Sequence, residues 1–265
     1  MITSSNNGNI KNIVALQKKG KVRKEQDAFV VEGIKMVSEI PEGNLMQLYV
    51  TESYLTRQEQ KKELEKIADF HGVVYEVVAD RVFQEMADTQ TPQGILAVVR
   101  QQHYRFEDLF SDKRAVHLMV LEGIQDPGNL GTILRAGEGA GVTGVILSKG
   151  TVDLYNPKVI RATMGSIYRV PFFYTDRFLE VLGEVRERTT LYAAHLLGEC
   201  CYDQADYRGD TAFLIGNEAN GLSEEAAGYA KCLIRIPMMG KVESLNAAVA
   251  ASVLMYEAAR QRRKK

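Results

Sequence analysis

Short β-rich apolar runs alternate with longer helical patterns along the whole chain. In the first hundred residues, β-branched runs bounded by glycine or polar residues predict strands at 28–31, 45–50, 73–78 and 94–99. Helices are predicted between them, near 11–19, 33–40, 57–70 and 80–87. This order predicts a small α/β/α unit over residues 1–100.

The second half repeats the alternation. Its apolar runs predict strands near 116–121, 144–148, 168–173, 191–197, 212–216 and 233–236, with helices between most of them. The last helix is predicted from Ser244, as N-cap, to about Arg262. Strands that alternate with helices predict a parallel sheet covered on both faces. The polar stretch 101–114 lacks periodicity and is predicted to be a linker, followed by a second domain over 115–265.

Composition restricts the kind of partner. The 265 residues are 45% apolar, which is enough for a sizeable core, and the formal net charge of -1 argues against a uniformly basic surface. Contact with a nucleic acid must therefore come from local clusters. One lies within residues 1–24, and the other, at 260–265, is either a contact or a solvated tail.

Three cysteines, two of them adjacent, do not form the spaced pairs of a zinc site or a disulfide framework. We therefore expect no metal and a reducing cytoplasm. The N-terminus has no apolar signal region, and no run approaches the roughly 18–20 apolar residues that span a bilayer. Secretion and membrane insertion are not expected.

Three motifs mark the second half. Motif one is Asn129–Arg135, motif two is Leu214–Ser223 and motif three is Ile236–Asn246, and each joins a strand-like run to the start of a helix. In an open α/β sheet, ligands bind at the carboxyl ends of strands. The three motifs therefore predict one assembled pocket.

In order and spacing these motifs resemble those of the SpoU/TrmH family of RNA ribose methyltransferases, over roughly residues 112–265. The resemblance implies S-adenosylmethionine as cofactor, transfer of its methyl group to a ribose 2'-hydroxyl, a deep trefoil knot, and a homodimer whose subunits complete each active site. The first domain is similar to the RNA-binding substrate domain of that family, an α/β/α unit like small ribosomal proteins. Phe29–Gly33 and Thr91–Ile95 carry this second likeness.

The resemblance ties Arg135 to catalysis; taken alone it is equally a surface arginine. Attack on a sulfonium makes the attacking oxygen more negative, so a fixed cation beside it stabilises the developing charge. A guanidinium pKa above about 12 argues against a role as base. Arg135 is predicted to orient the hydroxyl and an RNA phosphate, with the phosphate or a water as proton acceptor. Glu218 is predicted to hold the guanidinium, or to be a carboxylate at a helix start.

The other predicted site residues follow from the motifs. Asn129 is expected to cap the helix after the turn that begins at Asp126, and Ser244 and Asn246 to face the pocket. The predicted catalytic residues are Arg135, Asn129, Glu218, Ser244 and Asn246. The predicted cofactor contacts are Leu196, Gly216, Asn217, Gly221, Ile236, Met238, Leu245 and Asn246. The predicted RNA contacts are Lys18, Lys19, Lys21, Arg23, Lys24, Asn156, Lys158 and Arg161.

Three other functions are alternatives to this interpretation. A Rossmann dinucleotide enzyme is suggested by the glycines of 137–141, but these end a helix instead of following a strand. A non-catalytic RNA-binding protein and a knotted enzyme that modifies a base are the others. For the substrate, a large folded RNA is favoured, ribosomal over transfer RNA and of 23S type over 16S type.

Overall fold

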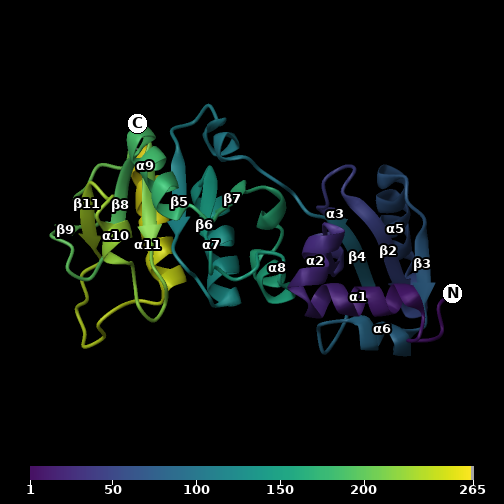
Figure 1. Cartoon of the computed structure of the whole chain (residues 1–265). Coiled ribbons are helices and arrows are strands. Elements are labelled where there is room, and N and C mark those ends of the chain that lie inside the picture. The colour runs from purple at the N-terminus through teal and green to yellow at the C-terminus, as the bar shows by residue number, and fades with distance from the viewer. Residues whose placement is uncertain (264–265) are drawn as a thin grey trace. The chain divides into compact units, whose positions relative to one another are not determined.

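The computed structural model describes residues 1–263, which form two compact units (Figure 1). Unit 1 contains Met1–Gln102 and Tyr155–Tyr168, and unit 2 contains His103–Leu154 and the chain from Arg169 onward. Lys264 and Lys265, the end of the predicted basic cluster, lie outside the described residues. The predicted limits of the domains and of the linker stay a prediction.

Unit 1 is built on a mixed sheet of four strands. They are β1 (Ala28–Glu32), β2 (Leu45–Thr51), β3 (Tyr75–Val78) and β4 (Ile95–Arg100), in the order β1-β4-β2-β3. β4 is antiparallel to both of its neighbours, and β2 is parallel to β3. The helices of this unit are α1 (Gly8–Lys18), α2 (Gly20–Gln26), α3 (Ile34–Ser38), α4 (Glu52–Leu55), α5 (Gln58–His71), α6 (Asp80–Met86) and α8 (Pro157–Thr163). The four predicted strands and four predicted helices are confirmed, with shifts of a few residues at their ends.

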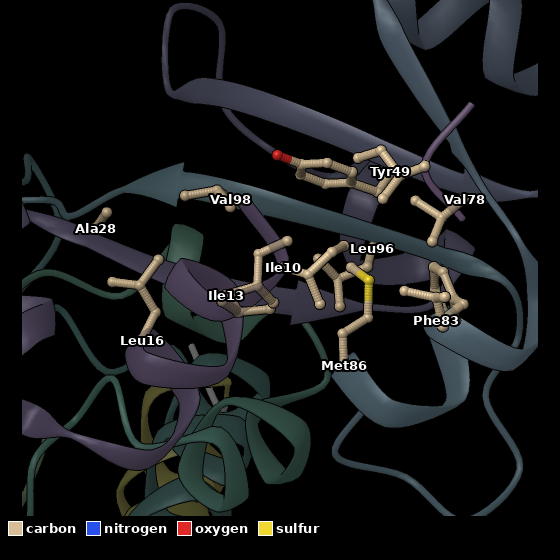
Figure 2. Close-up of a cluster of buried hydrophobic side chains, with 13 residues drawn as sticks. Ile10, Ile13, Leu16, Ala28, Tyr49, Val78, Phe83, Met86, Leu96 and Val98 are labelled. Atoms are coloured by element: carbon tan, nitrogen blue, oxygen red, sulfur yellow. The ribbon is translucent and has the colours of Figure 1, made fainter. Parts of the chain in front are cut away.

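One face of this sheet is buried beneath α1 and α6 (Figure 2). Ile10, Ile13 and Leu16 recur at helical spacing on α1 and pack with strand residues such as Val30. Side chains alternate between the two faces of a strand, so the neighbour of Val30, Phe29, points to the opposite face.

Residues 155–168, which lie between motifs one and two in the sequence, pack against the opposite face of β1. The rings of Phe29 and Tyr155 lie 4.6 Å apart between centroids. The Tyr155 hydroxyl accepts from the Gln102 N–H at 2.7 Å and donates to the Gln102 carbonyl at 2.9 Å. The Tyr168 hydroxyl donates to the carbonyl of Met36 at 3.2 Å. Residues 155–168 are therefore part of the core of unit 1.

Unit 2 is built on a parallel sheet of seven strands, as the alternation predicts. The strands are β5 (His117–Leu121), β6 (Gly144–Ser148), β7 (Phe172–Thr175), β8 (Thr190–Ala194), β9 (Cys200–Cys201), β10 (Thr211–Ile215) and β11 (Cys232–Arg235). Their order is β7-β6-β5-β10-β8-β11-β9, and every pairing is parallel. β7 starts later than predicted because residues 166–168 form a 3-10 turn, and the short β9 was not predicted.

Helices cover both faces of this sheet. They are α7 (Pro127–Ala140), α9 (Phe178–Arg188), α10 (Glu224–Ala227) and α11 (Ala247–Arg263), with a 3-10 helix at Phe106–Phe110. Val181, Leu182 and Val185 of α9 share one apolar cluster with the sheet, whereas α7 and α11 pack against each other and α11 contacts β10.

Two predicted helix caps are wrong. The N-cap of α7 is Asp126, whose carboxylate accepts from the Asn129 N–H at 2.8 Å; Pro127 occupies the first helical position, where it has no N–H that needs an acceptor. Asn246, not Ser244, caps α11, since its side-chain oxygen accepts from the N–H of Ala248 at 2.9 Å.

The described end of the chain is held inside unit 2. Arg262 donates to the carbonyls of Ala115, Val116, Tyr207 and Gly209 at 2.8–3.2 Å. Arg260 makes a bidentate pair with Glu257 at 2.7 and 2.6 Å. These two arginines of the predicted basic cluster therefore make hydrogen bonds within unit 2.

His117, at the start of β5, predicts a pH-dependent stability. Its side chain is 0% exposed, and neither ring nitrogen has a hydrogen-bond partner among the described residues. Burial, aided by the charges of Arg262 and Arg114, lowers its pKa from 6.5 to about 3. The unfolded chain therefore binds this proton first as the pH falls, so stability is complete above pH 6.5 and is lost below it by up to about 1.4 kcal/mol per pH unit.

We expect the free energy of unfolding of unit 2, followed by hydrogen exchange of the β5 and β10 amides, to fall between pH 7 and pH 5. His117→Phe, which keeps a ring beside Phe213, should remove most of this loss. An equal loss in that variant would assign the pH dependence to other groups.

Candidate active site

The motifs meet because the strands that precede them are neighbours. β5, β10, β8 and β11 are adjacent and parallel, so their carboxyl ends lie at one edge of the sheet. Glu122 follows β5, Leu196 lies in the turn after β8, Gly216 follows β10 and Ile236 follows β11. Edges of this kind are where open α/β sheets bind ligands.

A chain of side-chain hydrogen bonds links all three motifs. The Asn246 amide donates to the side-chain oxygen of Asn129 at 2.8 Å, and the Asn129 amide donates to Glu218 at 2.9 Å. Asn129 is only 8% exposed. Each amide donates in one direction and accepts in the other, so the orientation of both asparagines is fixed.

Glu218 also binds the backbone before α7. Its two carboxylate oxygens accept from the N–H groups of Gln125 at 3.1 Å and Asp126 at 3.0 Å. Partial burial acts to raise the pKa of Glu218, but these bonds and that from Asn129 outweigh it and hold the pKa below its usual value. Glu218 is thus an anion that joins motif two to motif one.

The predicted pairing of Glu218 with Arg135 is not what the structure shows. Arg135 lies six residues beyond Asn129 on α7, about 9 Å along the axis and about 120° around it. Its side chain is exposed and has no hydrogen-bond or ion-pair partner within residues 1–263. The structure therefore leaves Arg135 on a different side of the helix from the network, and its catalytic role stays a prediction.

Motif two forms a closed turn. The backbones of Asn217 and Gly221 exchange two hydrogen bonds of 2.9 Å, and Gly221 has a φ of 68°. A Cβ on Gly216 would lie 2.2–2.4 Å from backbone atoms of Gly221 and Leu222, so only glycine fits there. The Asn217 amide donates to the carbonyl of Gly123 at 2.7 Å and ties the start of the turn to the end of β5.

Motif three contributes irregular backbone between β11 and α11. Ile236, Met238 and Leu245 are half-buried, whereas Ser244 is exposed and makes no side-chain hydrogen bond in the described chain. Leu196 is 64% exposed in the neighbouring loop. Their place at the edge suits the predicted contacts with a cofactor, which remain predictions.

The sequence analysis missed several residues of this edge. Glu122 binds Ser223, and Asp126 caps α7; the acidic residue directly after an apolar strand was the available signal. Gly198 approaches β11 so closely that a Cβ would lie 2.7 Å from the backbone of Ile234. Ser223, the last residue of motif two, is the N-cap of α10.

The predicted RNA contacts all lie in unit 1. Lys18, Lys19, Lys21, Lys24 and Lys158 are exposed, as the role requires. Arg23 is the exception at 4% exposure, because it donates to the carbonyls of Leu16 and Gln17 in the last turn of α1. Asn156 caps α8 by accepting from the Lys158 N–H at 2.9 Å, and Arg161 pairs with Asp88. Arg23 is therefore removed from the candidate surface.

Residues 1–263 contain no group of three or more His, Cys, Asp or Glu placed to bind a metal ion. None of the helices in that range is both long and apolar enough to span a bilayer. The glycines of 137–141 end α7 instead of following a strand, which is not the dinucleotide-binding arrangement.

Comparison with known proteins agrees with this geometry. Residues 117–256 match the SpoU rRNA Methylase family, and residues 7–97 match the MRM3-like substrate binding domain. The chain is 29% identical over 257 residues to the 23S rRNA (guanosine(2553)-2'-O)-methyltransferase RlmP of Bacillus subtilis, covering 96% of this chain and 97% of that protein.

Solved structures are also similar over nearly the whole chain. The S-adenosylmethionine-bound rRNA methyltransferase of Sinorhizobium meliloti superposes with a TM-score of 0.85 at 30% identity, covering 98% of this chain and 97% of the other. The SpoU methyltransferase AviRb of Streptomyces viridochromogenes, also with S-adenosylmethionine, gives 0.84 at 25% identity, covering 98% and 100%.

Proposed function

We propose, from the premise that this chain belongs to the SpoU family of S-adenosylmethionine-dependent RNA 2'-O-methyltransferases, that it methylates a ribose of ribosomal RNA of the 23S type. The observation that carries the proposal is the linkage of motifs one, two and three through Asn246, Asn129 and Glu218. It joins, at one edge, the segments that would contact the cofactor and the ribose. The name of the relative RlmP supports the 23S substrate.

The cofactor site suits a sulfonium ligand bound mainly by backbone. The turn at 216–221 presents N–H and C=O groups without bulky side chains, and Ile236 and Leu245 offer apolar surface for the adenine. S-adenosylmethionine supplies the methyl group when bound. The residues of this chain then orient the ribose hydroxyl and stabilise the negative charge that develops on its oxygen.

A second copy of the chain would complete the site. The exposed side of α7 carries Arg135 among the small residues Gly128, Thr132 and Gly139, and neighbouring Val249 and Tyr256 of α11 are 48% and 49% exposed. A partner subunit that covers this side would bury apolar surface. Arg135 of each subunit would then lie at the active site of the other subunit. The deep trefoil knot of the family belongs to the same proposal. An experimentally determined backbone in which the chain does not thread through a loop would contradict it.

The proposal is tested on RNA from cells with and without the protein. Nuclease digestion and mass spectrometry should show one 2'-O-methylated nucleotide of 23S rRNA lost when the protein is absent and restored by its expression. Loss of a methylated nucleotide from transfer RNA or 16S rRNA instead would contradict the proposed 23S substrate. Unchanged methylation of all three RNAs would contradict a methyltransferase activity on any of them.

Unit 1 would hold the RNA through its exposed lysines. Replacing Lys18, Lys19, Lys21 and Lys24 by glutamate should weaken binding of 23S rRNA fragments and flatten its dependence on salt, by about 0.7–0.9 in the logarithmic slope per lost phosphate contact. The control replaces three exposed lysines of the same unit outside the predicted set, Lys61, Lys62 and Lys66 of α5. An unchanged slope in the first variant would remove these lysines from the interface.

A further inference from the structure

Glu122 connects the end of β5 to the end of motif two. Its carboxylate accepts from the Ser223 N–H at 2.9 Å and from the Ser223 hydroxyl at 2.7 Å. The same hydroxyl accepts from the Ala226 N–H at 3.2 Å and caps α10. One carboxylate therefore fixes the exact point where the turn of motif two passes into a helix.

Hydrogen bonds at three points hold the motif-two turn to the chain after β5. Asn217 binds the Gly123 carbonyl at the start of the turn, and Glu218 binds the backbone before α7 in the middle. Glu122 binds Ser223, beyond Gly221, at the end of the turn. Without it the turn keeps its first two anchors and loses the last.

The far end of the turn determines the shape of its beginning. Gly216 lies so close to Gly221 and Leu222 that no side chain fits between them. A displacement of residues 221–223 would therefore alter the spacing of the backbone groups around Gly216. These are the groups that the proposed function places against the cofactor.

We propose that Glu122 is a positioning residue that keeps the motif-two turn in the shape that binds S-adenosylmethionine. This inference rests on the proposed function. Because Glu122 acts through Ser223 on the cofactor turn and not on the Asn246–Asn129–Glu218 network, its loss should weaken cofactor binding and leave the rate at saturating cofactor nearly unchanged.

The test compares Glu122→Ala, Ser223→Ala and the double variant in the full chain. Glu122→Ala should raise the KM and the calorimetric Kd for S-adenosylmethionine roughly tenfold, as expected for loss of hydrogen bonds to a charged group, with kcat within about twofold. Glu122→Gln, which retains one acceptor oxygen, should recover part of the affinity. The double variant should be little worse than Glu122→Ala, because the shared contact is already lost.

The matched control is Glu107→Ala, which removes another bidentate carboxylate of unit 2, bound to Arg188 at 2.7 and 3.0 Å, away from the motifs. It should leave the KM for the cofactor unchanged. An unchanged KM in Glu122→Ala, or equal falls of kcat and kcat/KM, would overturn the inference. Failure of the wild-type protein to bind S-adenosylmethionine or methylate RNA would instead overturn the proposed function.

Discussion

Arg135→Ala is expected to slow methyl transfer about 100- to 1000-fold, the usual cost of removing one group that stabilises a developing oxyanion. Affinity for S-adenosylmethionine should change little, since the exposed side chain of Arg135 makes no hydrogen bond or ion pair with the turn of motif two. Single-turnover transfer to an rRNA fragment, with calorimetry of the cofactor, measures both quantities. Arg177→Ala, which removes an exposed arginine paired with Glu180 in the same unit, serves as the control and should retain full activity.

A mixing experiment distinguishes action of Arg135 in its own subunit from action in the site of a partner subunit. If it completes the site of a partner, inactive Arg135→Ala and inactive Asn246→Ala proteins should regain activity when mixed, because one site of the mixed dimer carries both native residues. Absence of recovery, in a mixture shown to exchange subunits, would place the arginine in its own subunit. A fully active Arg135→Ala protein would contradict the catalytic assignment itself.

Gly216→Ala is expected to have the second-largest effect. The added Cβ would lie 2.2 Å from the carbonyl carbon of Gly221 and 2.3 Å from the nitrogen of Leu222. These are backbone atoms, so the turn must open to admit the methyl group. We expect affinity for S-adenosylmethionine to fall about 10- to 100-fold, as for overpacking by 1–3 kcal/mol.

Gly209→Ala is the matched control, because no atom lies within 4 Å of its added Cβ. Circular dichroism and thermal unfolding establish that both variants are folded before calorimetry is carried out. Wild-type affinity in folded Gly216→Ala would show that the turn does not form the cofactor site.

Periodicity was sufficient for the parallel sheet and for most strands of both units. Apolar runs such as that of β10 are fully buried in the sheet, and burial of this kind makes them predictable from the hydrophobic pattern. The three motifs were predicted to meet, and the hydrogen bonds of Asn129 with Glu218 and Asn246 confirm that they do.

The misjudged details depend on contacts between distant parts of the chain. Arg23 has the same charge as the lysines around it, and only the folded end of α1 reveals that it binds carbonyls there. The side chain of Asn129 is hydrogen-bonded to Glu218, which is 89 residues away in the sequence, and to Asn246. Local sequence has no information on such a partner.

The same limit applies to the boundary of unit 1. Phe29 gives no sign that its ring will pack on Tyr155, and the segment 155–168 follows motif one in the sequence.

Unit 1 is therefore built from two separate stretches of the chain, residues 1–102 and 155–168. A chimera made by joining the first hundred residues of this chain to the remainder of a relative would replace the aromatic partners of Phe29 with foreign ones. Exchange of RNA specificity between such enzymes should therefore succeed only when residues 155–168 are transplanted together with the N-terminal segment, as one discontinuous module.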